Sequence, residues 1–76
     1  MRAFLVRETD KAVLLVKAED AKIPQVQGAW IPRSKLESFQ ETDDKSVTIS
    51  TKQDGERIGF PYIVTVNAAF AQKIGF

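Results

Sequence analysis

The chain has no cysteine and no histidine among its 76 residues. Without cysteine, no disulfide and no thiolate metal site can support the fold, so stability must come from apolar packing and hydrogen bonds. Without histidine, the chain lacks the commonest general base near neutral pH and the commonest metal ligand. The familiar catalytic triads are therefore excluded, and so is nucleophilic catalysis by a cysteine thiolate.

Glycine is also scarce, and the four glycines never approach the spacing of a phosphate-binding loop. The serines have no imidazole partner, and we interpret them as structural. Asp43 and Asp44 are adjacent, so their side chains diverge, and the acidic run at 41–45 has the pattern of a solvated turn. We therefore expect a protein that is not an enzyme and that holds no cofactor or metal.

Long hydrophobic runs are missing too: nowhere do about 18 apolar residues follow one another, as a membrane span requires. Residues 1–6 carry one charge, and their apolar run is too short for a signal peptide. Eleven Lys and Arg against ten Asp and Glu give a net charge of +1, too small to attract nucleic acid or a membrane strongly. We expect one small cytoplasmic domain over residues 1–76, without a membrane partner; the lack of cysteine fits a reducing compartment.

The first half of the chain has the pattern of β-strands. Residues 2–7 suit an extended strand, and a polar turn leads to the continuous apolar run at 12–17. Such a run, rich in β-branched residues, is typical of a strand covered on both faces, and we expect the two strands to form a hairpin. The chain returns to the sheet at 29–31. Pro32, which lacks an amide donor, ends that strand or places it at an edge.

Two connecting segments carry signals of their own. Residues 19–28 are polar and interrupted by proline and glycine, so we expect a loop with Ile23 and Val26 folded back onto the core. Residues 34–37, Ser-Lys-Leu-Glu, have the spacing of a helical capping box. This spacing predicts one helical turn with Leu36 and Phe39 facing inward.

The second half of the chain predicts further strands. Residues 46–51 alternate Val47 and Ile49 against Ser and Thr, as in a half-buried strand. Asp54-Gly55 is the strongest turn signal, because a type I′ hairpin needs positive φ, and it predicts a ribbon over 51–58. We expect the Gly59-Phe60-Pro61 segment to separate this ribbon from a last strand at 62–66.

A short helix is predicted at the end of the sequence. Asn67 is a good N-cap, and Phe70, Ala71 and Ile74 form an apolar stripe. Gly75 stands where a left-handed residue ends a helix, so the following Phe76 can pack back on the stripe. A helix of about two turns is marginal alone, so it must dock on the sheet.

Together these elements predict a mainly β fold with one C-terminal helix. We expect a small five-stranded antiparallel bent sheet, or a partly open barrel of the SH3 or OB type, with the helix closing one mouth. The alternative is an α+β sheet with the helix on one face, because the sequence does not give the order of the strands.

Three segments resemble a group of small phage and mobile-element proteins of undefined function. They are Lys11-Ala-Val-Leu-Leu-Val16, Trp30-Ile-Pro-Arg-Ser34 and the ending from Val66 to Phe76. In that group a strand pair is followed by a W-I-P-K/R-S segment and a short helix ending K-x-G-L. The chain departs from the pattern at Ala69, where such endings carry Trp, and in the ribbon around Asp54-Gly55. The resemblance implies a mobile-element setting and supplies no activity.

Two kinds of binding module fit these residues. In the first, a protein partner binds at the sheet edge near Pro32, where Trp30, Phe60 and Tyr62 supply aromatic anchors and Arg33 a charged one. We favour a protein partner over a nucleic acid because the acidic run at 41–44 follows the basic residues closely and would repel a phosphate backbone. We also expect Trp30 to face the core rather than solvent, so that Arg33 is the better exposed of the two.

The alternative is a single-stranded nucleic-acid binder. In it the same aromatic side chains stack bases, while four cations track the phosphates. These cations are Arg33, Lys35, Lys52 and Arg57. They share one face only if the ribbon at 52–57 folds over the Trp30 edge. A third reading pairs two copies of the chain through the Pro32 edge.

Overall fold

The computed structural model describes residues 1–76 and contains six strands, one α-helix and two short 3-10 turns. In chain order the elements are β1 (Arg2–Glu8), β2 (Ala12–Lys17), η1 (Ala18–Asp20), β3 (Ala29–Pro32), η2 (Arg33–Lys35), β4 (Leu36–Glu41), β5 (Val47–Thr51), β6 (Gly55–Val66) and α1 (Ala68–Ile74). The prediction of a mainly β fold with a C-terminal helix is confirmed, with six strands in place of five.

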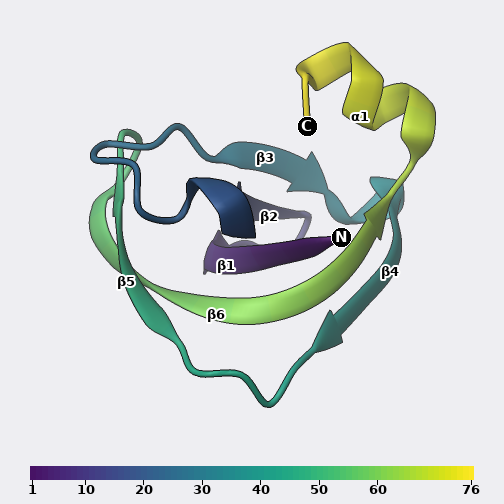
Figure 1. Cartoon of the computed structure of the whole chain (residues 1–76). Coiled ribbons are helices and arrows are strands. Elements are labelled where there is room, and N and C mark those ends of the chain that lie inside the picture. Colours follow the sequence, from purple (N-terminus) through teal and green to yellow (C-terminus); the bar gives the residue numbers. More distant parts are fainter.

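One bent antiparallel sheet joins all six strands in the order β3-β2-β1-β6-β4, and β5 also pairs with β6. β6 is the common partner: residues 55–59 pair with β5, 60–63 with β1 and 62–66 with β4. Figure 1 shows it as a long arc below β1 that rises toward β5 on one side and toward β4 on the other. The sheet does not close into a barrel.

The sheet has a core on each face, and β2 contributes to both. Val13 and Leu15 belong to one cluster of buried side chains, whereas Leu14 and Val16 belong to the other. All four are almost completely buried. The prediction that this strand is covered on both faces is therefore confirmed. α1 and β4 pack on the first cluster, and Val26 and Ile49 complete the second.

β6 bends without breaking at Gly59 and Pro61, so the predicted interruption there is wrong. Gly59 is buried, and a Cβ atom there would lie 2.5 Å from Cδ1 of Ile49. Val64 donates its amide to Met1 beside β1, so the alternation of a strand turns Pro61 toward the opposite edge. There Pro61 faces the loop between β4 and β5, where no ladder hydrogen bond is lost.

The predicted helical turn after Ser34 is also wrong. η2 ends at Lys35, has no side-chain cap, and is followed by β4, which pairs with β6. Pairing with an otherwise open edge of β6 outweighs a local capping signal of modest free energy. Leu36 and Phe39 nevertheless pack against the first core cluster, so the inward direction predicted for them is confirmed.

The loop after η1 folds back at one of its two apolar residues. Val26 is buried, with 6% of its surface exposed, whereas Ile23 is 49% exposed, so the prediction is confirmed for the first and wrong for the second. Val26 forms a parallel bridge with Thr51: its amide donates to the Ser50 carbonyl at 2.9 Å and its carbonyl accepts from the Lys52 amide at 2.8 Å.

α1 begins and ends as predicted. The Asn67 side chain accepts a hydrogen bond from the Phe70 amide at 3.0 Å, and Gly75 has the left-handed φ of 76°. The Phe76 amide then donates to the Ala71 carbonyl, and the Phe76 ring packs on the first core cluster. No helix is long and apolar enough to span a membrane.

Gly59→Ala is expected to lower the free energy of unfolding by about 1–3 kcal/mol, as overpacking of a core does. The new Cβ would meet Ile49 Cδ1 at 2.5 Å and Phe4 Cβ at 3.0 Å. Urea denaturation followed by circular dichroism measures the change. Ile49→Val removes Cδ1, so the double variant should lose less stability than the sum of the two single changes. A Gly59→Ala variant as stable as the parent would contradict the tight bend.

Candidate functional site

The outer edge of β3 has no strand beside it, since β3 pairs only with β2. The Arg33 amide donates to the Lys11 carbonyl beside β2, whereas the Gly28 amide and carbonyl face the opposite way. Hydrogen-bonding direction alternates along an antiparallel strand. The amide and carbonyl of Trp30 and the carbonyl of Pro32 therefore point away from β2, toward the free edge.

The side chain of Gln53 closes this edge at one end. Its Oε1 accepts from the Gly28 amide at 3.1 Å, and its Nε2 donates to the Gly28 carbonyl at 2.6 Å. A side-chain amide thus takes the place of a strand residue beside Gly28. Two residues further on, Trp30 has no such partner.

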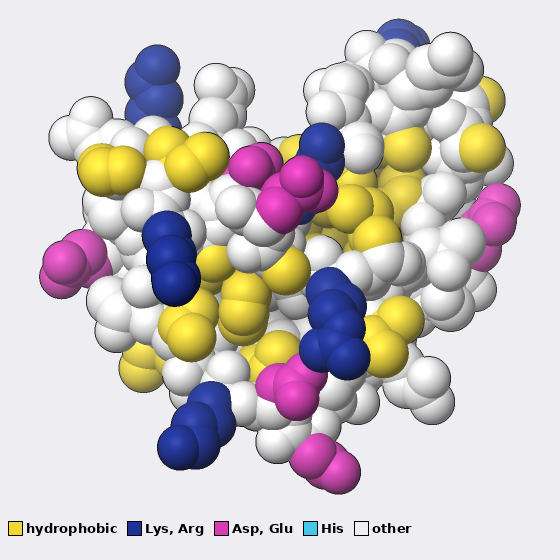
Figure 2. All heavy atoms as spheres, in the orientation of Figure 1, with side chains coloured by type: hydrophobic (Ala, Val, Ile, Leu, Met, Phe, Trp, Pro, Cys, Tyr) yellow, Lys and Arg dark blue, Asp and Glu magenta, His cyan; other side chains and the backbone are white.

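A groove of about 490 Å³ lies along the free edge. Trp30 and Ala29 line it on one side and Ile74 and Phe76 of α1 on the other. The space is seen as the hollow at the top of Figure 2, between the lobe of α1 and the lobe that carries the β5–β6 turn. Lys17 lies at the groove with its Nζ 5.7 Å from the centre of the Phe76 ring. Polar side chains, among them Asp20 and Gln53, also line it, so the groove combines apolar contacts with polar side chains and with the main-chain groups of β3.

Trp30 is 39% exposed, so the expectation that it faces the core is wrong. The neighbouring Ile31 points into the first core cluster, and the period of a strand turns Trp30 to the opposite face, beside Leu14. Because β3 is at an edge, no further strand covers the indole there. Ile74 across the groove is 40% exposed.

Arg33 is held by the β1–β2 hairpin. Its Nη2 donates to Glu8 Oε2 at 2.8 Å, and its Nε and Nη2 both donate to the Thr9 carbonyl. These bonds tie the start of η2 to the hairpin, so the guanidinium acts as a brace rather than as the free charged anchor that we expected.

The other arginines are paired in the same way. Arg2 binds Asp44 at 2.7 Å, and Arg7 and Arg57 both face Asp54. Arg57 also donates from Nε to the Val6 carbonyl at 3.3 Å. Each of the four arginines thus has a carboxylate beside it, which reduces its attraction for a phosphate backbone.

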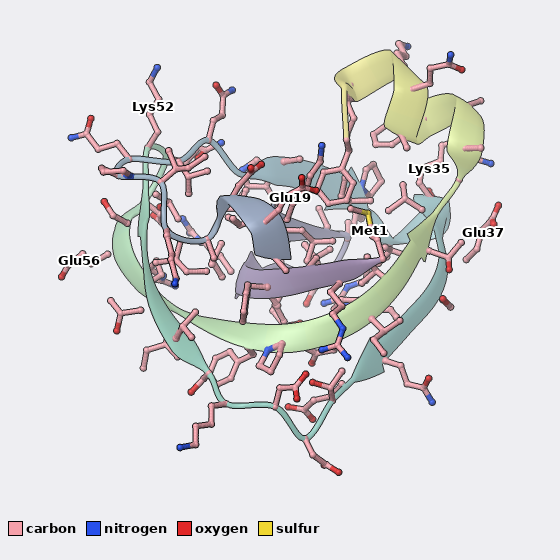
Figure 3. The ribbon with its side chains drawn as sticks, viewed as in Figure 1. Met1, Glu19, Lys35, Glu37, Lys52 and Glu56 are labelled. Atoms are coloured by element: carbon pink, nitrogen blue, oxygen red, sulfur yellow. The ribbon has the colours of Figure 1, made fainter.

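The remaining two predicted cations lie far apart. Figure 3 shows Lys52 at the β5–β6 turn and Lys35 at the base of α1, on opposite sides of the molecule. Both are exposed. Arg33, Lys35, Lys52 and Arg57 therefore do not form one basic face, as the nucleic-acid reading requires.

The two other predicted aromatic residues differ in exposure. Tyr62 stacks on Phe39, with ring centres 4.2 Å apart and planes 9° from parallel, and packs against the first core cluster. Phe60 is 46% exposed, next to Val6 and Arg57 in two shallow grooves of about 310 and 340 Å³. The structure therefore does not gather Trp30, Phe60 and Tyr62 around a single ligand.

The sequence patterns did not predict three groups of this site: the Gln53 side chain, the Ile74 side chain and the unpaired backbone of Trp30. The order of the strands decides which edge is open, and no local pattern encodes it. No group of three or more acidic side chains is placed to hold a metal ion. Comparisons with protein-family models, curated proteins and solved structures find no match to this chain.

The single tyrosine of the chain gives an internal test of this electrostatic arrangement. Burial raises the pKa of the Tyr62 phenol above 10.0, the carboxylates of Glu41 and Glu8 raise it further, and Arg33 opposes them. Ultraviolet absorbance should therefore give a phenolate midpoint above 10.0. Glu41→Gln should lower that midpoint, and a midpoint at or below 10.0 in the parent protein would contradict the arrangement.

The same shift has a consequence for stability. Between the unfolded and folded pKa values of Tyr62, the folded state keeps a proton that the unfolded state has lost, so the free energy of unfolding falls as pH rises above 10.0. Tyr62→Phe should remove this part of the alkaline loss.

Proposed function

We propose that the protein is a non-catalytic protein-binding module that accepts an extended segment of its partner beside β3. The observation that carries the proposal is the unpaired main chain of Trp30 in a groove that Ile74 and Phe76 line on the other side. Strand addition at such an edge draws affinity from main-chain hydrogen bonds and specificity from side-chain contacts. Trp30 is also partly exposed, and tryptophan is among the residue types that most often contribute a dominant share of the binding free energy at protein interfaces.

The free groups define how a partner strand would pair. Trp30 offers an amide and a carbonyl, Pro32 offers only a carbonyl, and the two groups of Gly28 are already bound by Gln53. A partner strand therefore gains three main-chain hydrogen bonds. Its residue opposite Trp30 would lie beside the indole, and the next residue would point toward Ile74 and Phe76. We infer a partner segment with apolar side chains at these two adjacent positions.

Two other partners, a single-stranded nucleic acid and a second copy of the chain, match the edge of β3 less well. A single-stranded nucleic acid would need several free cations along its path, but Lys17 is the one cation that lines this groove, and the four arginines are paired with carboxylates. A second copy of the chain, paired about Trp30, would gain only two main-chain bonds, because Pro32 has no amide and Gly28 is engaged. In the mobile-element setting that the sequence resemblance implies, the module would act as an accessory or inhibitor of another protein.

Selection from a displayed library of random linear peptides tests the proposal directly. We expect enriched sequences with two adjacent apolar residues, whose binding shifts the emission of Trp30, the only tryptophan, to shorter wavelength. Trp30→Ala should weaken binding of a labelled enriched peptide about thirtyfold, as loss of a dominant aromatic anchor does. Trp30→Pro should weaken it about tenfold further, since it also removes the edge amide.

The pair of variants separates the edge amide from the indole. Circular dichroism should show both folded, because the amide of Trp30 has no partner in the sheet. Equal binding by Trp30→Ala and Trp30→Pro, or a library from which nothing is enriched, would contradict strand addition at β3. Binding of oligo(dT) that weakens steeply with salt would favour the nucleic-acid reading, and we expect none even at low salt.

A further inference from the structure

The largest groove of the molecule, about 840 Å³, lies between β5 and the loop that follows η1, away from the edge of β3. Apolar side chains line it from three segments of the chain, among them Phe4, Ile23 and Val47. Ile23 is 49% and Val47 39% exposed. Figure 2 shows hydrophobic side chains gathered over this part of the surface, at the left. The volume is that of a ligand cleft, about 300–1,000 Å³.

One wall of this groove is an unpaired strand edge. The Ser50 carbonyl and the Lys52 amide point away from β6, because both bond to Val26. By the alternation of the strand, the amide and carbonyl of Thr48 and the amide of Ser50 face the same way. Thr48 and Ser50 line the groove. The wall therefore offers two main-chain donors and one acceptor.

The edge stays open because the loop leaves it after a single bridge. Pro24 has no amide, and Gln25 has a φ of 52°, so the chain turns away from β5 just before Val26. The Gln25 amide bonds only to the Ser50 hydroxyl, at 3.3 Å. Val26 thus pairs with the outer edge of β5 at one position only, and no residue pairs with that edge beside Thr48.

The charges around the groove favour a basic occupant. Glu19 and Glu56 line it, and neither takes part in any of the four ion pairs of the chain. Lys22 is the single cation among the lining residues. Figure 3 shows that Glu19 comes from η1 and Glu56 from the outer part of β6. Glu56 pairs with Ser50, so the two side chains share a face with that of Thr48.

We propose that the edge of β5 is a second binding site, for an extended segment of a partner protein in which β-branched apolar residues alternate with polar and basic ones. The residue opposite Thr48 lies on the solvent face, and its two neighbours point toward Val47 and Phe4. A basic residue opposite Ser50 reaches Glu56. A lipid or an apolar small molecule would leave the main-chain groups of Thr48 unpaired, so it matches the groove less well.

The blocked peptide Lys-Val-Thr-Val-Lys, which has this alternation, is the test ligand. Added at millimolar concentration to isotope-labelled full-length protein, it should shift the amide resonances of Thr48 and Ser50 and leave that of Trp30 in place. The charge-reversed peptide Glu-Val-Thr-Val-Glu should bind at least several-fold more weakly. Shifts centred on Trp30, or equal binding of the two peptides, would overturn the proposal. The readout is independent of the site beside β3.

Thr48→Pro and Thr48→Ala form the matched pair of variants. Both remove the side chain, but only the proline removes the outward amide, and an edge proline leaves the ladder to β6 intact. We expect Thr48→Pro to bind the basic peptide about tenfold more weakly than Thr48→Ala. Ile23→Ser, at an exposed loop position, should weaken binding without affecting the fold. Unchanged binding in Ile23→Ser, or equal binding in the two Thr48 variants, would contradict the site.

Discussion

The two main-chain hydrogen bonds between Val26 and β5 are the interaction on which the rest of the structure depends. They hold the loop after η1 against the sheet and bury Val26 in the second core cluster. Together with the two Gly28–Gln53 bonds, they join the segment before β3 to β5 and the β5–β6 turn at one point of the open sheet, residues 26–28. On one side of that point the edge of β3 is free at Trp30, and on the other the edge of β5 is free at Thr48. Both proposed binding sites are consequences of a sheet that is bridged only at Val26 and Gly28 and is not closed into a barrel.

The sequence predicted those elements whose structure depends on residues close together in the chain, namely β2 and α1. The run at 12–17 is apolar on both faces because the sheet has a core on each side, and its composition alone indicates this. The ends of α1 follow from Asn67 and Gly75 because capping is a property of neighbouring residues. By contrast, β4 was missed because its strand conformation comes from pairing with β6, distant in sequence. Pro61 was misjudged because its missing amide is harmless only at a position that the fold creates.

The candidate site was harder to predict than the fold, for a physical reason. Residue types indicated Trp30 and the cations, but whether a tryptophan is covered depends on which strand lies beyond it. Arg33 and Arg57 were expected to be free, yet Arg33 lies beside Glu8 of the distant β1–β2 hairpin and Arg57 beside Asp54, three residues before it. The groups that carry the proposals are largely main-chain amides and carbonyls, which every residue except proline has in full and no sequence pattern marks. Strand order alone determines which of them remain unpaired.

Amide hydrogen exchange, measured residue by residue on the protein without any ligand, tests the central claim most directly. Unpaired edge amides exchange fast, whereas amides bonded within a stable sheet open only with partial or global unfolding. The account predicts fast exchange at Trp30, Thr48 and Ser50, and slow exchange at their neighbours Val26, Gly28 and Lys52. Protection of Trp30 and Thr48 equal to that of Val26 would contradict it, because both edges would then already have a partner.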